Sequence, residues 1–371
     1  MELREVPEPT AADNEVVIRV KAGGLNPVDS KVQMAGAQFV WPLDLPRVAG
    51  SELSGVVEDL GRHVTRFKVG DRVFARVDKR KLGAYATYCV VEEGLVAKMP
   101  DSLGFEDAAG LPLAGLTAWQ GLRQIGVTSG QRVFISGGAG GVGTLAIQLA
   151  VQMGAEVATT ASAKGERLVR SLGAETVIDY RNQKFRDVLS EYDGAFLLTG
   201  GRDLMDAFSI VKRGGNVVSV THVDPTTARE DLSAGPVVIA AAWVANTKIR
   251  RQTRRAGISY RSLLMRPSGE DLGVLADLVG RDQLRPITDR VFPFERIADA
   301  FTYLEEAMPK GRSSFGSEIA GPAFRRVGRC GTVNRGFSGP NQRCHQPCDG
   351  GRTSSFHRFD RRPGAGSART C

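Results

Sequence analysis

The chain has 371 residues, and its 49 Lys and Arg against 41 Asp and Glu leave a formal net charge of +8. A charge of this size suggests a nucleic-acid or anionic-surface partner. Its position argues against one, because residues 312–371 hold eleven Arg and only three acidic residues, whereas residues 1–311 hold equal numbers of basic and acidic residues. We therefore expect no nucleic-acid partner, and residues 1–311 are enough for one or two hydrophobic cores.

Cysteine usage and hydropathy indicate the compartment. Cys89 is the one cysteine of residues 1–311, which argues against a disulfide framework. The longest apolar run, at Pro236–Ala245, is far shorter than the roughly 20 residues of a membrane-spanning helix. We expect a soluble, cytoplasmic protein without a membrane partner.

The first hundred residues alternate short apolar runs with turn residues, which predicts β-strands joined by long connections. Val16, Ile18 and Val20 share one face of the first run, and the pattern breaks at Gly23 and Gly24. Further apolar runs follow at residues 53–57, 72–75 and 85–91.

After about residue 112, predicted strands alternate with predicted helices. This alternation is typical of a parallel sheet covered on both faces. The strands are predicted at residues 132–136, 156–160, 176–180, 194–199 and 216–221. The helices are predicted at residues 142–153, 165–172, 203–212, 248–255 and 270–279. Arg250, Arg251, Arg254 and Arg255 are interpreted as a solvated helix face, with phosphate binding as the alternative.

A glycine-rich turn follows the strand predicted at residues 132–136 and opens the next helix. Its pattern is Gly138-x-Gly140-x-x-Gly143, the arrangement of a dinucleotide-binding loop. Glycine is needed because a Cβ would hold the pyrophosphate away from the backbone N–H groups and the helix N-terminus. We expect Gly138, Gly140, Gly141, Val142 and Gly143 to bind the cofactor.

Cofactor choice is decided about 20 residues further on, where an NAD site places an acidic residue. Here the chain has Thr160, Ser162, Lys164 and Arg167, and the nearest acid, Glu166, lies in the following helix. A hydroxyl and two cations suit a 2′-phosphate, so NADPH is the predicted cofactor. The alternative is that these cations are ordinary surface residues.

Several further motifs occur in order along the chain. They are Gly24-Leu25-Asn26-Pro27-Val28-Asp29, Gly50-Ser51-Glu52-x-x-Gly55, and residues 67–73, 83–86 and 111–119. Together with the glycine loop, they resemble the medium-chain dehydrogenase/reductase superfamily, and within it the zinc-independent NADPH:quinone oxidoreductases related to zeta-crystallin. The resemblance covers about residues 3–311.

The resemblance implies an α/β fold in which a GroES-like β-rich catalytic domain flanks a Rossmann domain with a doubly wound parallel sheet. The expected divisions are residues 1–111 for the first part of the catalytic domain, 112–255 for the Rossmann domain, 256–311 for the return to the catalytic domain, and 312–371 for a disordered basic tail. By analogy, a homodimer would form through the edge at residues 258–265.

The resemblance also implies functional residues. Asn26 and Thr117 would lie near the nicotinamide and act as the catalytic residues, although each also fits a turn or strand position. Gly140–Gly143 would hold the pyrophosphate. Ser162, Lys164 and Tyr180 would surround the 2′-phosphate.

Zinc ligands are absent from the positions where the alcohol-dehydrogenase branch carries them. Ser51 and Glu52 stand in place of its His–Glu pair, Asn26 stands near the position of its cysteine, and residues 77–83 contain no Cys. A site without a Lewis acid suits an electrophilic acceptor such as a quinone. The alternatives are an α,β-unsaturated carbonyl, favoured by Lys31 where relatives often carry Tyr, and an NADPH-binding sensor or structural protein without activity.

The tail departs from the family, whose members end in a strand such as Val-Val-Val-Arg-Ile. If Arg312 is encoded by CGG and residues 313–317 by TCG TCG TTC GGA TCG, then reading from the last base of CGG gives Val-Val-Val-Arg-Ile. The tail is therefore interpreted as the product of a shifted reading frame. The alternatives are an RNA-binding segment and a zinc site formed by Cys344, His345 and Cys348 with Cys330 or His357.

Overall fold

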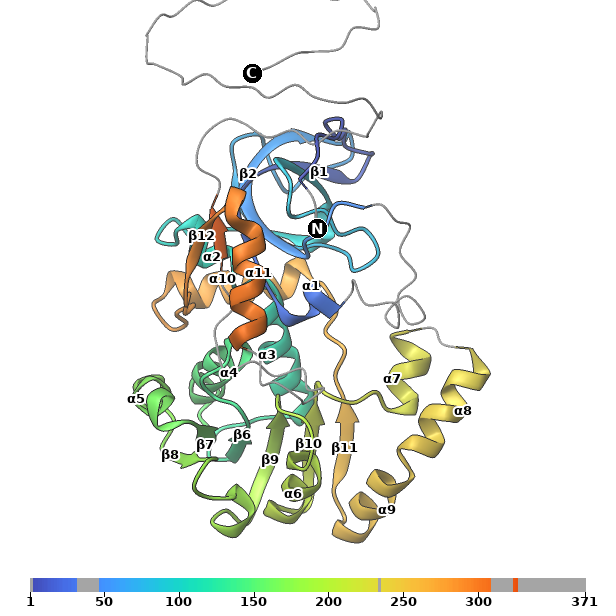
Figure 1. Cartoon of the computed structure of the whole chain (residues 1–371), viewed down its shortest axis with the longest axis vertical. Helices are drawn as coiled ribbons and strands as arrows, with labels where there is room; N and C mark the ends of the chain where they lie inside the picture. The colour runs from blue at the N-terminus through green and yellow to red at the C-terminus, as the bar shows by residue number, and fades with distance from the viewer. Residues whose placement is uncertain (1–2, 32–46, 233–234, 308–322, 326–371) are drawn as a thin grey trace, which may run out of the picture. The chain divides into compact units, whose positions relative to one another are not determined.

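The computed structural model describes residues 3–31, 47–232, 235–307 and 323–325, and its strands form two sheets (Figure 1). In the first sheet the order is β12-β13-β1-β2-β3-β5, with β4 also paired to β1. Its strands are β1 (Glu15–Gly24), β2 (Glu52–Leu60), β3 (Arg72–Arg76), β4 (Tyr88–Glu92), β5 (Val96–Lys98), β12 (Val291–Pro293) and β13 (Ala323–Arg325). Val16, Ile18 and Val20 are buried together in its core, which confirms the face predicted for the first run.

The second sheet is entirely parallel, in the order β11-β10-β9-β6-β7-β8. The chain runs outward from β6 to β8 and then returns to the other side of β6, so the strand order reverses between β6 and β9. Ligands of such sheets bind at the carboxyl ends of the strands beside this reversal. The strands are β6 (Arg132–Ile135), β7 (Glu156–Ala161), β8 (Thr176–Asp179), β9 (Tyr192–Leu197), β10 (Val211–Ser219) and β11 (Ser259–Ser262).

Helices cover both faces of the parallel sheet because its strands are apolar on both sides. Val133 and Ile135 of β6 pack into a core with α3 and α4, whereas Phe134 packs into a second core with α6 and α9. These helices are α3 (Pro112–Ile125), α4 (Gly141–Gln152), α6 (Asp203–Ile210) and α9 (Thr247–Ala256). The GroES-like sheet and the Rossmann sheet expected from the resemblance are therefore both present.

The remaining helices connect these parts. They are α1 (Pro27–Lys31), α2 (Phe105–Ala109), α5 (Ala163–Ser171), α7 (Pro225–Glu230), α8 (Pro236–Ala245), α10 (Gly269–Gly280) and α11 (Ile297–Ala307). Two glutamine side chains fix the chain on either side of α10. The Gln120 amide of α3 exchanges two hydrogen bonds with the backbone of Arg266, and the Gln148 amide of α4 exchanges two with the backbone of Arg285.

Two sequence-based boundaries and one element assignment need correction. The division expected at residues 255 and 256 cuts through the parallel sheet, because β11 is its edge strand. The helix predicted at 203–212 ends at Ile210, since Val211 already pairs with Tyr192 of β9. Thr117, for which a strand position was considered, lies in the middle of α3.

The tail prediction is also wrong at one point. Residues Ala323–Arg325 form β13, which pairs antiparallel to β1 and parallel to β12. A three-residue strand can be held there because β1 and β12 offer backbone partners on both sides. The rest of the predicted tail after residue 312, including the cysteines and the segment read in a shifted frame, lies outside the described residues.

Candidate functional site

The glycine loop after β6 is too tightly packed for side chains at two of its predicted positions. A Cβ on Gly138 would lie 2.2 Å from Thr159 Oγ1, and a Cβ on Gly143 would lie 2.3 Å from the carbonyl oxygen of Gly137. Gly137 itself has a φ of +67°, which favours glycine. The glycines are therefore required for the turn and for the close approach of α4 to the loop.

Thr160 of β7 holds this loop. The N–H of Gly137 donates to Thr160 Oγ1 at 2.9 Å, and the N–H of Gly138 donates to the Thr160 carbonyl at 2.9 Å. Thr160 is also buried. The Thr160 hydroxyl thus serves the glycine loop, and Ser162 is the hydroxyl residue predicted for the 2′-phosphate.

The N-terminus of α4 is suited to a pyrophosphate. Helix α4 begins at Gly141 after Gly140, and no side chain of the described residues caps it, so its first N–H groups keep their donor capacity. Gly141, Thr144 and Leu145 line a small pocket whose other wall includes Ile287 and Thr288. Donor amides, the positive helix end and tight glycines together fit the diphosphate of a dinucleotide.

The predicted 2′-phosphate residues lie at the carboxyl edge of two neighbouring strands. Ala161 of β7 pairs with Asp179 of β8, so the next residues, Ser162 and Tyr180, leave the sheet side by side. Ser162 is the N-cap residue of α5, but its side chain makes no capping hydrogen bond. Tyr180 is exposed.

The cations of this group are exposed on α5. Lys164 lies in its first turn and Arg167 one turn later. The nearby acid Glu166 forms an ion pair with Arg170 at 2.9 Å. Gly165 lets α5 approach the glycine loop, because a Cβ there would lie 2.8 Å from the Cβ of Ala139. The residues predicted to bind the 2′-phosphate therefore lie near the glycine loop, at the same edge of the sheet, which is compatible with NADPH.

Asn26, one of the two predicted catalytic residues, lies in the buried turn between β1 and α1. Its backbone N–H donates to Asp29 Oδ2 at 2.8 Å, and its side-chain amide donates to Glu52 Oε1 of β2. The amide is therefore held in a fixed orientation by a buried carboxylate.

Thr117, the other predicted catalytic residue, is linked to the same carboxylate. Glu52 Oε2 accepts the backbone N–H of Leu113 at 2.6 Å, in the first turn of α3. Thr117 Oγ1, one turn later, donates to the Leu113 carbonyl at 2.7 Å. The structure thus brings Asn26 and Thr117 together through Glu52 and Leu113.

Glu52 is a candidate site residue that sequence reasoning did not assign. Its side chain is 1% exposed, and burial raises the pKa of its carboxyl to about 7, although the hydrogen bonds from Leu113 and Asn26 lower it. Its position beside Ser51, where the zinc branch carries its His–Glu pair, is the signal that could have identified it.

Further buried polar groups surround Glu52. Arg76 of β3 is 5% exposed and donates to the carbonyl oxygens of Ser51 and Val77. Burial lowers the pKa of Arg76 and raises that of Asp29, and each charge partly offsets the effect on the other. The Tyr85 hydroxyl donates to the Gly24 carbonyl at 3.0 Å. These contacts fix β1, β2 and β3 behind Asn26.

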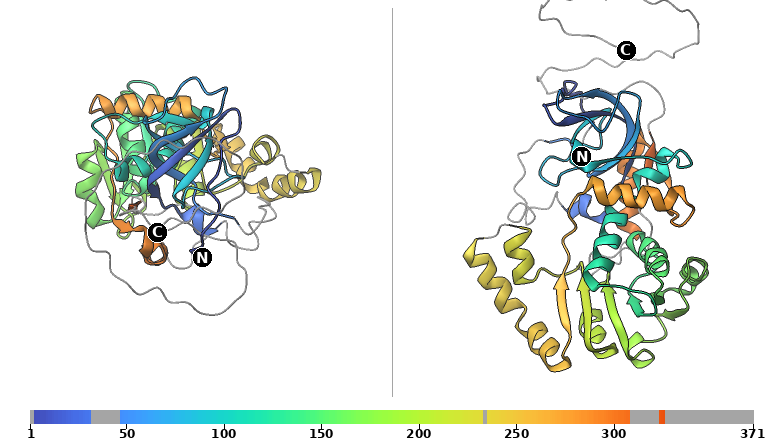
Figure 2. Two further views of the ribbon diagram at one scale, coloured as in Figure 1. Left: turned by 90° about the horizontal axis from the view of Figure 1, so that it is seen from above. Right: turned by 180° about the vertical axis from the view of Figure 1, so that it is seen from behind.

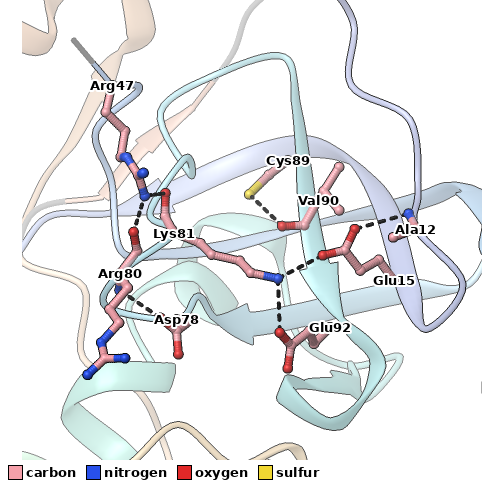
Figure 3. A network of polar contacts seen from close by, with 9 residues as sticks. All are labelled: Ala12, Glu15, Arg47, Asp78, Arg80, Lys81, Cys89, Val90 and Glu92. Carbon is pink, nitrogen blue, oxygen red and sulfur yellow. Dashed lines mark hydrogen bonds and ion pairs between the residues drawn. The ribbon is translucent and has the colours of Figure 1, made fainter. Parts of the chain in front are cut away.

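Residues 77–83, which lack the cysteines of the zinc branch, are held by ionic contacts (Figure 3). Lys81 Nζ contacts Glu15 Oε1 at 2.8 Å and Glu92 Oε1 at 2.9 Å. The Arg47 guanidinium donates to the carbonyl oxygens of Arg80 and Lys81. The hydrogen bonds to Glu15 and Glu92 raise the pKa of Lys81.

Comparison with protein families agrees with this geometry. The family described as "Alcohol dehydrogenase GroES-like domain" matches residues 12–101, and the family described as "Zinc-binding dehydrogenase" matches residues 172–312. These ranges cover the first sheet except β13, and the parallel sheet except β6 and β7. Among the residues that the structure describes, no group of three or more His, Cys, Asp or Glu could hold a metal ion.

Individual proteins show the same relationship. "NAD(P)H oxidoreductase RTN4IP1, mitochondrial" of Danio rerio is 32% identical over 323 residues, which cover 81% of this chain and 83% of the relative. "NADPH-dependent alkenal/one oxidoreductase, chloroplastic" of Arabidopsis thaliana is 35% identical over 315 residues, which cover 82% of this chain and 72% of the relative. The structure of the quinone oxidoreductase from Coxiella burnetii matches with a TM-score of 0.70 and 30% sequence identity, and the match covers 86% of this chain and 93% of that chain.

The first two names carry organelle labels, so a cytoplasmic location stays a prediction. In the described part of the chain, no helix has both the length and the apolar character needed to cross a bilayer. From the two sheets, the glycine loop, the Asn26–Glu52 contact and these relatives, the chain belongs to the medium-chain dehydrogenase/reductase superfamily, in its zinc-independent, quinone-oxidoreductase-like branch.

Proposed function

We propose that this chain is an NADPH-dependent oxidoreductase that reduces a quinone or a similar electrophilic small molecule without zinc. The observation that carries the proposal is the buried contact of Glu52 with Asn26 and with Leu113 of α3. It joins the first sheet to the helix that bears Thr117, and so orients both predicted catalytic side chains. The named relatives support an oxidoreductase that uses NADPH.

Different residues of the chain would bind different parts of NADPH. The first N–H groups of α4, at Gly141, would hold the diphosphate, and Ser162, Lys164, Arg167 and Tyr180 would hold the 2′-phosphate. NADPH, when bound, supplies the hydride. Such a site contributes mainly orientation and the exclusion of water.

The hydrogen bonds of Glu52 support an acceptor of this kind. Its two oxygens already accept hydrogen bonds from Asn26 and Leu113, so this carboxylate serves to position its neighbours. An acceptor that takes a hydride readily, such as a quinone, fits a site that orients its substrate.

The test is an NADPH-oxidation screen of the full chain with 1,4-naphthoquinone, 9,10-phenanthrenequinone and methyl vinyl ketone. We expect turnover of at least one quinone, and the Asn26→Ala variant should lower kcat while it leaves the Kd of NADPH within about twofold. NADPH binding without turnover on any acceptor would contradict the proposal and favour a sensor or structural protein.

The cofactor assignment has its own test. Replacing Lys164 by alanine should raise the KM for NADPH about five- to tenfold, since an exposed charge-assisted contact contributes roughly 1 kcal/mol. The KM for NADH should hardly change. Lys184→Ala changes an exposed lysine in the connection between β8 and β9 and is the matched control. A wild-type preference for NADH would refute the assignment.

A second candidate is reduction of an α,β-unsaturated carbonyl, which is supported by the name of the Arabidopsis relative and by the Lys31 departure. The kcat/KM for methyl vinyl ketone, compared with that for the quinones, decides between the two acceptors.

We also propose that the protein is a homodimer through β11. This strand pairs only with β10 among the described strands, so its outer edge offers backbone groups to a second copy. Light scattering during size-exclusion chromatography would measure the mass, and a monomer at all concentrations would contradict this proposal.

A further inference from the structure

Helix α8 is the most apolar helix of the chain, and it is exposed. It consists only of Pro, Val, Ile, Ala and Trp, and none of its residues is buried. The side chains of Val237, Val244, Val238 and Trp243 are 80%, 74%, 55% and 53% exposed. Figure 2 shows α7 and α8 in yellow, outside the parallel sheet, and α8 packs mainly on α7 and α9. Exposed apolar surface of this kind marks a binding surface.

The exposed residues lie around the helix. Successive residues of an α-helix are about 100° apart, so Val237 and Val238 face different directions, and Trp243 faces a third. A helix that is apolar on all sides is found in a core or in a membrane. One side of α8, with the half-buried Ile239 and Ala242, packs on α7 and α9, and the rest of its apolar surface is exposed and can contact lipid.

The length of α8 limits how it can enter a bilayer. Ten residues at about 1.5 Å each span roughly 15 Å, which is half of a hydrocarbon core of about 30 Å. The helix is therefore long enough to enter one leaflet and too short to cross both.

Charge identifies the type of lipid. Residues 236–256 contain five cations and no acidic residue. The cations all lie on α9, and none forms an ion pair within the described residues; they are Lys248, Arg250, Arg251, Arg254 and Arg255. The guanidinium of Arg250 lies 3.2 Å from the centroid of the Trp243 ring, which joins the apolar helix to the basic one.

The acidic residues that are closest in sequence to α8 and α9 form ion pairs with other basic residues. Glu230 of α7 contacts Arg229 at 3.6 Å, and Asp231 contacts Arg266 at 2.5 Å. Segments with a cluster of cations beside exposed apolar residues and Trp bind anionic membrane surfaces.

We propose that α8 and α9 form a peripheral membrane-docking surface for bilayers with anionic headgroups. Helix α8 enters the outer part of the leaflet, Trp243 lies at the level of the headgroups, and the cations of α9 contact lipid phosphates. This replaces the sequence-based expectation that the protein has no membrane partner. It is independent of the proposed reductase activity.

The experiment measures sedimentation of the full chain with phosphatidylcholine vesicles that do or do not contain phosphatidylserine. We expect binding to the anionic vesicles at least tenfold tighter than to the neutral ones. The double variant Val237→Asp/Val244→Asp should lose at least tenfold in affinity. Trp fluorescence should shift to shorter wavelength on binding, and Trp243→Phe should abolish the shift.

The matched control is Val69→Asp/Val188→Asp, which changes two valines that are 62% and 56% exposed elsewhere. It should bind vesicles like the wild type, and thermal unfolding should show that both double variants are folded. Residues 312–371 carry excess positive charge and could bind anionic lipid themselves. Equal binding by Val237→Asp/Val244→Asp and the wild type would therefore overturn the proposal. A second result would also overturn it: the wild type binds no vesicles but forms an oligomer, and Val237→Asp/Val244→Asp dissociates that oligomer. Helix α8 would then be a contact between copies of the chain.

Discussion

Replacing Glu52 by glutamine tests whether the buried carboxylate has the environment seen in the structure. The change keeps the size of the side chain and removes its charge. Burial raises the pKa of Glu52 to about 7 from an ordinary value of 4.5, against the lowering effect of the hydrogen bonds from Leu113 and Asn26. Glutamine also places an NH₂ group against one of these two donors, which costs roughly 1 kcal/mol at every pH.

The pH dependence separates these two effects. The unfolded carboxyl loses its proton near pH 4.5, whereas the folded one keeps it to about pH 7. Between these values the folded chain binds more protons, so its stability falls as the pH rises through this window. One pKa unit corresponds to about 1.4 kcal/mol, so Glu52 should remove roughly 3 kcal/mol of stability between pH 4.5 and 7.

The assay is denaturant unfolding of the wild type and of Glu52→Gln from pH 4 to 8. The free energy of unfolding of the wild type should fall about 3 kcal/mol further than that of the variant across the window. Asn26→Ala is the control, because it keeps the carboxyl but removes a hydrogen bond that lowers its pKa. In Asn26→Ala, the pH range over which the free energy of unfolding falls should extend to higher pH. Parallel curves for the wild type and Glu52→Gln would refute the reasoning.

Three further substitutions test the packing and the surface contacts. Gly138→Ala places a Cβ 2.2 Å from Thr159 Oγ1 and should weaken NADPH binding at least tenfold in a fluorescence titration. Gly121→Ala places a Cβ 2.2 Å from the Phe196 ring and should cost about 1–3 kcal/mol in denaturant unfolding without changing the KM for NADPH. Lys81→Met removes two ion pairs of a largely exposed lysine, so it should cost less than about 1 kcal/mol, and less still in high salt.

Gly273→Ala is the control for the glycine substitutions. A Cβ at this position of α10 meets no atom within 4 Å, so alanine should stabilise the helix by roughly 0.5–1 kcal/mol. A loss as large as that of Gly121→Ala would show that crowding is not the cause. For Lys81→Met, a loss that does not change with salt would argue against an electrostatic contribution.

Local patterns were sufficient to predict the parallel sheet and the glycine loop. A strand, a glycine turn and an amphipathic helix follow one another within about 20 residues, so periodicity and glycine spacing carry the information. The 2′-phosphate residues could be proposed for the same reason, because Ser162 and Lys164 directly follow the second strand. Their roles stay predictions.

The polar network around Glu52 could not be predicted in this way. It joins Asn26, Glu52 and Leu113, which are distant along the chain and come from different elements. Thr160 shows the same limit within a single strand. Its position suggested a phosphate contact, but the tertiary fold turns its hydroxyl toward the N–H of Gly137.

The sequence by itself therefore determined the fold class, the dinucleotide loop and the excess of positive charge after residue 312, because each depends on residues close together in the chain. Only the tertiary structure decided the burial and hydrogen bonds of Glu52, the edge strand β11, the pairing of β13 and the exposure of α8. Burial and hydrogen bonding depend on which distant segments meet, and an apolar run such as Pro236–Ala245 has the same sequence whether it is buried or exposed to solvent.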